Sequence, residues 1–118
     1  MNSYDEAIMA VKALDSKKGL DIQLIEIKDI SVLADYMVIA TGTSSTHVKA
    51  LADEVEYQLD NQGVSVSHIE GYRSNGWILL DYVDVLVNVF SDESREFYDL
   101  DRLWQDGKII DISDVIKQ

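Results

Sequence analysis

Few residues of this sequence have the types and spacing that catalysis or metal binding requires. The chain contains two histidines, His47 and His68, and no cysteine. Without thiolates, a metal site would need several carboxylates to complete it, and neither a His-Glu-x-x-His motif nor a calcium-binding loop occurs. We therefore expect both histidines to be exposed or hydrogen-bonded locally, and we predict no catalytic residue, no metal site and no cofactor.

Two other patterns keep an enzymatic alternative open. The segment Gly42-Thr43-Ser44-Ser45 could bind an anion at a helix N-terminus, although it lacks the lysine and further glycines of nucleotide-binding loops. N-capping by Ser44 or Ser45 is the simpler interpretation. Asp81 and Asp84 could be paired magnesium ligands, but residues three apart on a strand point to opposite faces. The alternative function is thus a nucleotide-binding or nucleotidyltransferase-like enzyme.

The size and composition of the chain fit a single globular domain. Its 118 residues are 47% hydrophobic and 27% charged, which is the balance of an ordinary folded protein. We expect the domain to span residues 1–105. Residues 106–118 form a C-terminal extension that is apolar enough to dock and short enough to fray, so the sequence leaves its order open.

The sequence also indicates where the protein resides. The N-terminal residues lack the basic and apolar regions of a signal peptide, and no apolar run approaches the roughly 20 residues of a membrane span. The absence of cysteine suits a reducing compartment. We expect a cytoplasmic protein that does not bind membranes.

A large negative charge restricts the partners. The chain has 22 acidic and 10 basic side chains and a formal charge of −12. This charge repels phosphate backbones and anionic lipids, so we expect no direct, sequence-specific binding of nucleic acid. The same field would steer the protein toward a basic protein surface.

The periodicity of apolar residues in the first half predicts alternating helices and strands. Residues 4–14 have helical spacing behind a Ser3 N-cap, and residues 22–27 form a β-rich run. Residues 36–40 are apolar at both parities, which is typical of a strand buried on both faces in the middle of a sheet. A helix with one apolar stripe follows and ends at 61–63.

The second half predicts further strands and a C-terminal helix. The alternation from Val64 to Ile69 predicts a strand, and Asn75-Gly76 is a strong turn signal. Residues 77–82 and 83–90 predict two strands joined by a tight hairpin or bulge. The stretch 93–104 has helical spacing throughout. We therefore predict an α/β fold with a mixed sheet of about five strands flanked by helices.

The predicted strand 77–82 carries large side chains on both of its faces. Trp77, Leu79 and Asp81 alternate along it and share one face. The C-terminal helix either covers this face or leaves an apolar patch with an acidic rim. Trp77 combines a large apolar area with an indole N–H donor, and tryptophan is a frequent interface anchor.

Several sequence blocks occur in a distinctive order along nearly the whole chain. The early blocks are Asp35-Tyr36, Ile39 to Ser45, and Val48-Lys49-Ala50-Leu51-Ala52-Asp53-Glu54-Val55. The later blocks are Glu70-Gly71, Trp77, Asp81, Asp84-Val85, Val87, Val89-Phe90, and Glu93 to Leu100 with Leu103-Trp104. In these blocks the chain resembles the Iojap family, the ribosomal silencing factors known as RsfS.

The resemblance implies a function and a fold. It implies a factor that binds the large ribosomal subunit through ribosomal protein number fourteen and thereby blocks joining of the small subunit. The family is associated with repressing translation when nutrients are scarce, and its fold looks like a nucleotidyltransferase core without the catalytic residues. The segment beyond Trp104 varies in the family and carries no role that can be transferred.

The charge and the resemblance together suggest where a partner binds. Ribosomal RNA would repel so acidic a factor, so we expect a basic ribosomal protein to bind an apolar anchor ringed by carboxylates. Strand parity makes Glu70, Trp77, Leu79 and Asp81 the candidate partner-binding residues. Because exposed apolar strands often pair symmetrically, we also expect a weak homodimer when the protein is free.

Two positions depart from the family pattern. Asn88 stands where family members commonly carry histidine, and Val83 replaces a usual glycine before Asp84. A β-branched residue resists positive φ angles, so Val83 argues against a tight positive-φ turn at this position.

Overall fold

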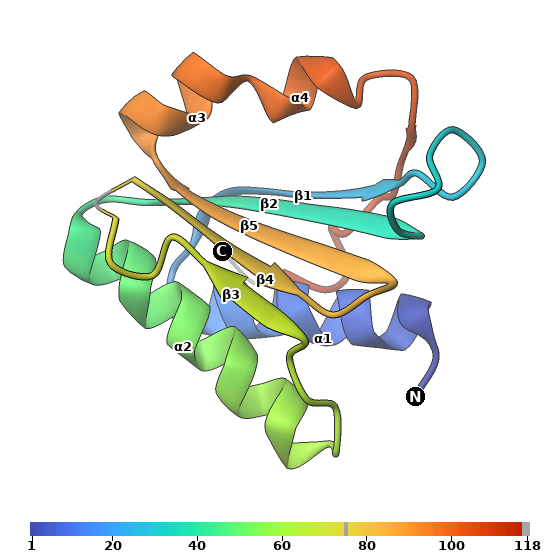
Figure 1. Cartoon of the computed structure of the whole chain (residues 1–118), viewed down its shortest axis with the longest axis horizontal. Coiled ribbons are helices and arrows are strands. Elements are labelled where there is room, and N and C mark those ends of the chain that lie inside the picture. The colour runs from blue at the N-terminus through green and yellow to red at the C-terminus, as the bar shows by residue number, and fades with distance from the viewer. Residues whose placement is uncertain (75, 117–118) are drawn as a thin grey trace.

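A six-stranded mixed sheet lies between two layers of helices (Figure 1). This computed structural model describes residues 1–74 and 76–116. The sheet order is β3-β4-β5-β2-β1-β6. In chain order the elements are α1 (Ser3–Ser16), β1 (Leu20–Glu26), β2 (Tyr36–Gly42), α2 (Ser45–Asn61), β3 (His68–Glu70), β4 (Trp77–Asp81), β5 (Val85–Ser91), α3 (Asp92–Tyr98), α4 (Leu100–Leu103) and β6 (Lys108–Ile109). The mixed α/β fold is confirmed, with one strand more than the sequence predicts.

Strand β2 occupies the middle of the sheet. All seven of its residues are buried, which confirms the prediction from the apolar run at 36–40. It pairs in parallel with β5 and antiparallel with β1. Because parallel strands need a long crossover connection, the chain passes through α2, β3 and β4 before β5 returns beside β2.

Helices α1 and α2 cover one face of the sheet and enclose the larger core. Their apolar stripes pack on β2, β4 and β5, and the main contributors are Ala10, Val11, Leu14, Val48, Leu51, Val55 and Leu59. A Cβ atom on Gly42 would lie 2.9 Å from the backbone nitrogen of Val48, so α2 starts directly against the end of β2. No helix in the described part of the chain is long and apolar enough to cross a membrane.

The caps of the two long helices test two predictions. The prediction of a Ser3 N-cap for α1 is wrong by one residue, because Asn2 Oδ1 accepts the hydrogen bond from Asp5 N at 2.8 Å. The Ser3 hydroxyl instead donates to Asp35 Oδ2 at 2.9 Å. Capping of α2 by Ser44 is confirmed, since its hydroxyl accepts from His47 N at 3.0 Å.

The opposite face of the sheet has a smaller core under α3 and α4. The prediction of one helix over 93–104 is wrong, because Asp99 adopts a left-handed conformation with φ 51° and separates two short helices. Aspartate tolerates this conformation better than most residues. Leu100 and Trp104 pack on the buried cluster of this face, which comprises Ile25, Ile27, Ala34, Met37, Ile39 and Phe90.

The segment between α2 and β4 is less regular than its sequence suggests. The predicted strand from Val64 shortens to β3, which contains three residues. Val64 and Val66 lie in the preceding connection and pack against the larger core. Asn75 of the predicted turn lies outside the described residues.

The segment after α4 adds the edge strand β6 to the sheet, beside β1. Ile109 lies opposite Ile25 in an antiparallel pair, and Ile110 N donates to Leu24 O at 2.9 Å. The chain then passes to the α1 side, where Ile112 is 8% exposed and joins the larger core. Residues 117 and 118 lie outside the described part of the chain. The tail thus contributes to both the sheet and the core.

The β4–β5 connection is a tight antiparallel hairpin, as the sequence predicts. The sequence argues against a positive φ angle at Val83, but this expectation is wrong, because its φ is 73°. Asp84 N donates to Tyr82 O at 2.9 Å across Val83, and the Asp81 carboxylate accepts from Val83 N at 2.8 Å. These two hydrogen bonds offset the steric strain of the β-branched side chain, which points into solvent.

Ile112 provides a test of whether the tail stabilises the core. Replacing Ile112 by Ala should lower the free energy of unfolding by about 2 kcal/mol, because truncating a buried side chain leaves a cavity in the core. Ile109→Ala is the matched control, since Ile109 is 62% exposed in the same tail. Urea unfolding of both variants checks this; equal stabilities would contradict docking of the tail.

Val83 provides a test of backbone strain. Val83→Gly should raise the free energy of unfolding by about 1 kcal/mol, because glycine adopts φ 73° without a Cβ clash. The side chain is 62% exposed, so little packing is lost. Val83→Ala keeps the Cβ atom, so its free energy of unfolding should lie between those of the parent and the Gly variant. Thermal unfolding gives the order, and a Gly variant less stable than the parent would contradict it.

Candidate functional site

Strand β4 presents one face to the larger core and the other to α3 and solvent. Ile78 and Leu80 are buried on the α2 side, whereas Trp77, Leu79 and Asp81 are half-buried on the other face. Strand β3 forms the edge of the sheet beside β4. The predicted alternation of side chains along this strand is therefore confirmed.

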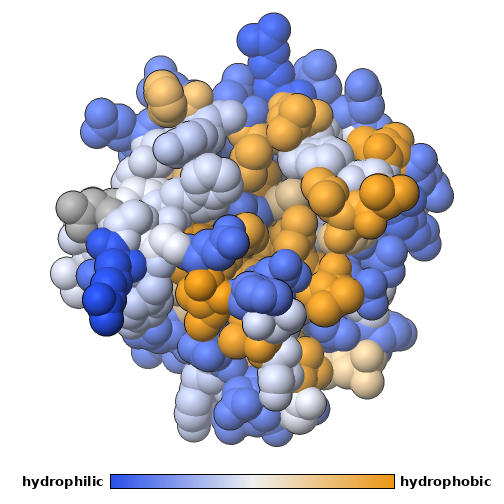
Figure 2. Space-filling view, viewed as in Figure 1, coloured by the Kyte–Doolittle hydropathy of each residue, from blue (hydrophilic) through white to orange (hydrophobic). Residues whose placement is uncertain are grey.

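Three of the four candidate partner-binding residues surround one surface hollow. Glu70 lies directly opposite Leu79 in the antiparallel β3–β4 pair and is exposed. Glu70, Gly71, Trp77 and Leu79 line a hollow of about 250 Å³. Figure 2 shows hydrophobic surface in the middle of this side of the molecule, interrupted by hydrophilic side chains. The hollow thus offers an apolar floor with one carboxylate at its rim.

Asp81 lies apart from this hollow. Its Cα atom pairs with Leu86 on β5 and with His68 on β3, at the far end of β4 from Trp77. Its carboxylate accepts the hydrogen bond from Val83 N in the hairpin turn. Asp81 shares the sheet face with the other candidates, but it stabilises the turn.

Trp77 is held in place by contacts within the protein. Its ring centroid lies 5.0 Å from that of Phe90 and 4.6 Å from that of Tyr98. Its indole N–H donates to Asn88 Oδ1 at 3.0 Å. The N–H is therefore already used, so Trp77 offers a partner its half-exposed ring surface alone.

Asn88 is a positioning residue that sequence reasoning missed as part of the site. It is 2% exposed in the middle of β5, and its side-chain nitrogen lies 2.7 Å from Met37 Sδ. A buried amide must find partners, and Trp77 and Met37 provide them. The signal in the sequence was one polar residue inside the apolar run Val85-Leu86-Val87-Asn88-Val89-Phe90.

The sequence leaves open whether the C-terminal helix covers the Trp77 face or leaves an apolar patch. The structure shows each arrangement over part of this face. Tyr98 of α3 covers one side of the indole ring, so the C-terminal helices shield part of the face. Leu79 and the rest of the hollow stay open beside β3. The helices α3 and α4 are too short to reach across the whole sheet, which leaves this edge uncovered.

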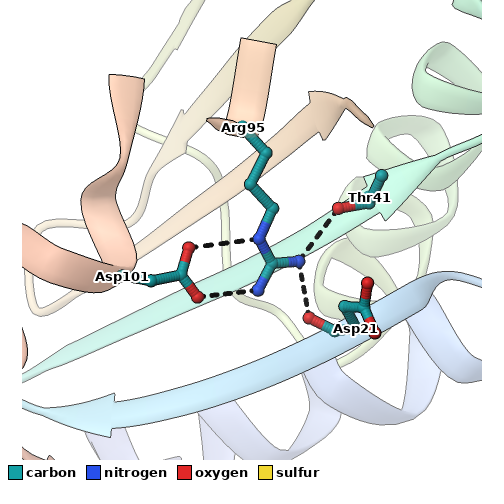
Figure 3. A network of polar contacts seen from close by, with 4 residues as sticks. All are labelled: Asp21, Thr41, Arg95 and Asp101. Atoms are coloured by element: carbon teal, nitrogen blue, oxygen red, sulfur yellow. Dashed lines mark hydrogen bonds and ion pairs between the residues drawn. The ribbon is translucent and has the colours of Figure 1, made fainter. Parts of the chain in front are cut away.

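Arg95 fastens α3 and α4 to the sheet (Figure 3). Its Nε and Nη2 atoms donate to the two carboxylate oxygens of Asp101 at 3.1 and 2.9 Å. Its Nη1 atom donates to the Asp21 carbonyl at 2.6 Å and to the Thr41 hydroxyl at 2.9 Å. A bidentate pair fixes the guanidinium plane. This one side chain therefore links β1, β2, α3 and α4.

Several acidic side chains lie near the β4–β5 hairpin on its α1 and α2 side. Burial, followed by repulsion from Asp84, raises the pKa of the Glu6 carboxyl. Burial also raises the pKa of the Tyr82 hydroxyl, with further contributions from Glu56 and Asp60. The N-terminal ammonium opposes the rise in the pKa of Glu6, whereas the carboxylates near Tyr82 add to the rise in its pKa.

The other sequence candidates are engaged in local structure. His47 Nδ1 accepts from Thr43 N at 2.8 Å, and its Nε2 lies 2.8 Å from the Lys17 carbonyl. The prediction of local bonding is thus confirmed for His47, which ties the start of α2 to the end of α1. Among the described residues, no group of three or more His, Cys, Asp or Glu side chains could hold a metal ion.

Comparisons with known proteins agree with one another. A family model described as "Ribosomal silencing factor during starvation" matches residues 1–118. The "Ribosomal silencing factor RsfS" of Bacillus subtilis is 37% identical over 112 residues, covering 95% of each chain. The protein of that name from Halalkalibacterium halodurans is 34% identical over 98% of this chain and 99% of its own. A crystal structure of a Chromobacterium violaceum protein has a TM-score of 0.87 and 36% identity, covering 89% and 88%.

Arg95 provides the test of how the site is positioned. Arg95→Gln should lower the free energy of unfolding by about 2 kcal/mol, less than for a fully buried pair because Asp101 is partly exposed. It should also change the fluorescence of Trp77, measured in a Trp104→Phe background, because Tyr98 loses its fixed position. Arg102→Gln is the control, since Arg102 is exposed and forms no ion pair with any described residue. Unchanged fluorescence would contradict the positioning role.

Proposed function

This chain belongs to the family of ribosomal silencing factors, and from that premise we propose that it represses translation by binding, without catalysing a reaction. In this proposal it binds the large ribosomal subunit through ribosomal protein number fourteen. The bound factor then occupies the surface where the small subunit would dock. Its action is steric and requires no cofactor.

The observation that carries the proposal is the hollow beside β3 on a strongly acidic protein. Glu70 stands at its rim, and Trp77 and Leu79 supply the apolar surface. Protein interfaces combine such an apolar centre with a polar rim. At a charge of −12 the protein is repelled by ribosomal RNA, so a basic ribosomal protein is the complementary surface.

The same face suggests what the protein does when it is free. An open apolar sheet edge often pairs with a second copy in a symmetric dimer. We propose a weak homodimer in the cytoplasm that uses the β3–β4 face. Binding to the ribosome would then require the dimer to dissociate, because both partners occupy one surface.

Sedimentation of purified ribosomal subunits tests the proposal. The protein should migrate with large subunits in a sucrose gradient and lower the yield of full ribosomes. Glu70→Lys should weaken this binding by about tenfold, because it places a cation against a basic partner.

Asp60→Lys is the matched control for this experiment. It changes the net charge equally, but Asp60 is exposed on α2, which covers the other face of the sheet. Asp60→Lys should therefore retain binding. Failure of the unchanged protein to sediment with large subunits would overturn the proposed function, and equal loss in both variants would show that only net charge matters.

A further inference from the structure

Strand β3 is held in the sheet without burying any of its own side chains. Its three residues, His68, Ile69 and Glu70, are all exposed, and the strand pairs with β4 at the edge of the sheet. So short an edge strand opens easily, because little beyond backbone hydrogen bonds keeps it in place. Val66 packs against the larger core and anchors the end where β3 begins. The other end, at Glu70, needs a contact from elsewhere.

Tyr72 supplies this contact two residues after Glu70. Its hydroxyl donates to the Asp53 carboxylate of α2, at 2.9 and 3.1 Å from the two oxygens. The Lys49 ammonium lies 5.9 Å from the centroid of the Tyr72 ring, which is within the range of a cation–π contact. The hydrogen bond to Asp53 is the main cause that raises the pKa of the Tyr72 hydroxyl, so this group stays a donor at neutral pH. The loop after β3 is thus tied to α2.

Contacts within the loop transmit this restraint to the rim of the hollow. Gly71 has a φ of 76°, and a Cβ atom on it would clash with the Trp77 carbonyl oxygen, so glycine is required between Glu70 and Tyr72. Ser74 Oγ donates to Trp77 O at 2.9 Å, and Ser74 N donates to Gly71 O at 2.8 Å. A displacement of Tyr72 would therefore move Glu70 with it.

We propose that the hydrogen bond between Tyr72 and Asp53, here called the Tyr72–Asp53 contact, positions the β3 side of the binding hollow. The inference rests on the proposed function and assigns positioning residues outside the hollow that act on its rim. While the contact is formed, Glu70 is held opposite Leu79 of β4. When the contact breaks, the rim can move, and a partner binds only the fraction of molecules in which β3 is in place.

Asp53 allows this role to be separated from direct binding by Tyr72. It is exposed on α2, in the layer that covers the other face of the sheet. Asp53→Ala therefore breaks the contact without changing the face that carries the hollow. Asp53→Asn removes the charge but keeps a side-chain oxygen that can accept from the Tyr72 hydroxyl.

Hydrogen–deuterium exchange of the free protein tests the contact itself. Tyr72→Phe and Asp53→Ala should each melt like the parent, because both side chains are exposed and the larger core is unchanged. In each variant the backbone amides of 68–71 should exchange about fivefold faster, which is the usual effect of losing one hydrogen bond. Asp53→Asn should keep the parent's exchange rate.

Affinity for purified large ribosomal subunits tests the role in binding. Tyr72→Phe and Asp53→Ala should each bind about threefold more weakly. The double variant should bind no more weakly than either single variant, because both changes break the same hydrogen bond. Asp53→Asn should bind like the parent. Weaker binding by Tyr72→Phe alone, with Asp53→Ala unchanged, would mean that Tyr72 contacts the partner directly and would overturn the positioning role.

Tyr57→Phe is the matched control for the loss of a hydroxyl. Tyr57 is 61% exposed on the same helix as Asp53, and its hydroxyl has no hydrogen-bond partner among the described residues. This variant should match the parent in both exchange and binding.

The outcomes separate this inference from the proposed function. Unchanged exchange of 68–71 in both Tyr72→Phe and Asp53→Ala would overturn the inference and leave the proposed function standing. Faster exchange with the parent's affinity would also overturn it, because the position of β3 would then not affect binding. If the unchanged protein does not bind large subunits, the proposed function falls, and the role of the Tyr72–Asp53 contact in binding falls with it.

Discussion

The burial of β2 on both faces is the constraint on which the rest of the structure depends. Seven consecutive buried residues need a layer on each side of the sheet. Helices α1 and α2, with 14 and 17 residues, supply one layer. The other layer consists of α3 and α4, with seven and four residues, which cover the middle of the sheet but not the edge at β3 and β4. The open edge with its apolar hollow follows from this unequal covering.

Two polar residues, Arg95 and Asn88, position the side chains of that open edge. Arg95 binds Asp101, Asp21 and Thr41, and so places Tyr98 against Trp77. At the edge of the ring, Asn88 accepts the hydrogen bond from the indole N–H. Trp77 is thus held by a ring contact and a hydrogen bond within the protein. In the proposed function, the tryptophan side chain would be a rigid apolar surface, and the carboxylates around it would give specificity for a basic partner.

The spacing of apolar residues predicted those helices and strands whose burial follows directly from that spacing. The double-sided apolar run of β2, the stripe of α2 and the alternation of β4 all have the expected structure. The break at Asp99 was not predictable from periodicity, because residues on both sides keep helical spacing. Long-range contacts such as that of Arg95 with β1 and β2 leave no trace in local sequence. The positive φ of Val83 depends on the hairpin hydrogen bonds, which outweigh its steric preference.

In the proposed function, the sheet face at β3 and β4, and not the α1–α2 layer, binds the large ribosomal subunit. Hydrogen–deuterium exchange on the intact protein, with and without purified large subunits, tests this directly. If this face binds, backbone amides in 68–71 and 76–81 should exchange more slowly when subunits are present, with exchange in α1 and α2 unchanged. Protection confined to α1 and α2 would contradict it.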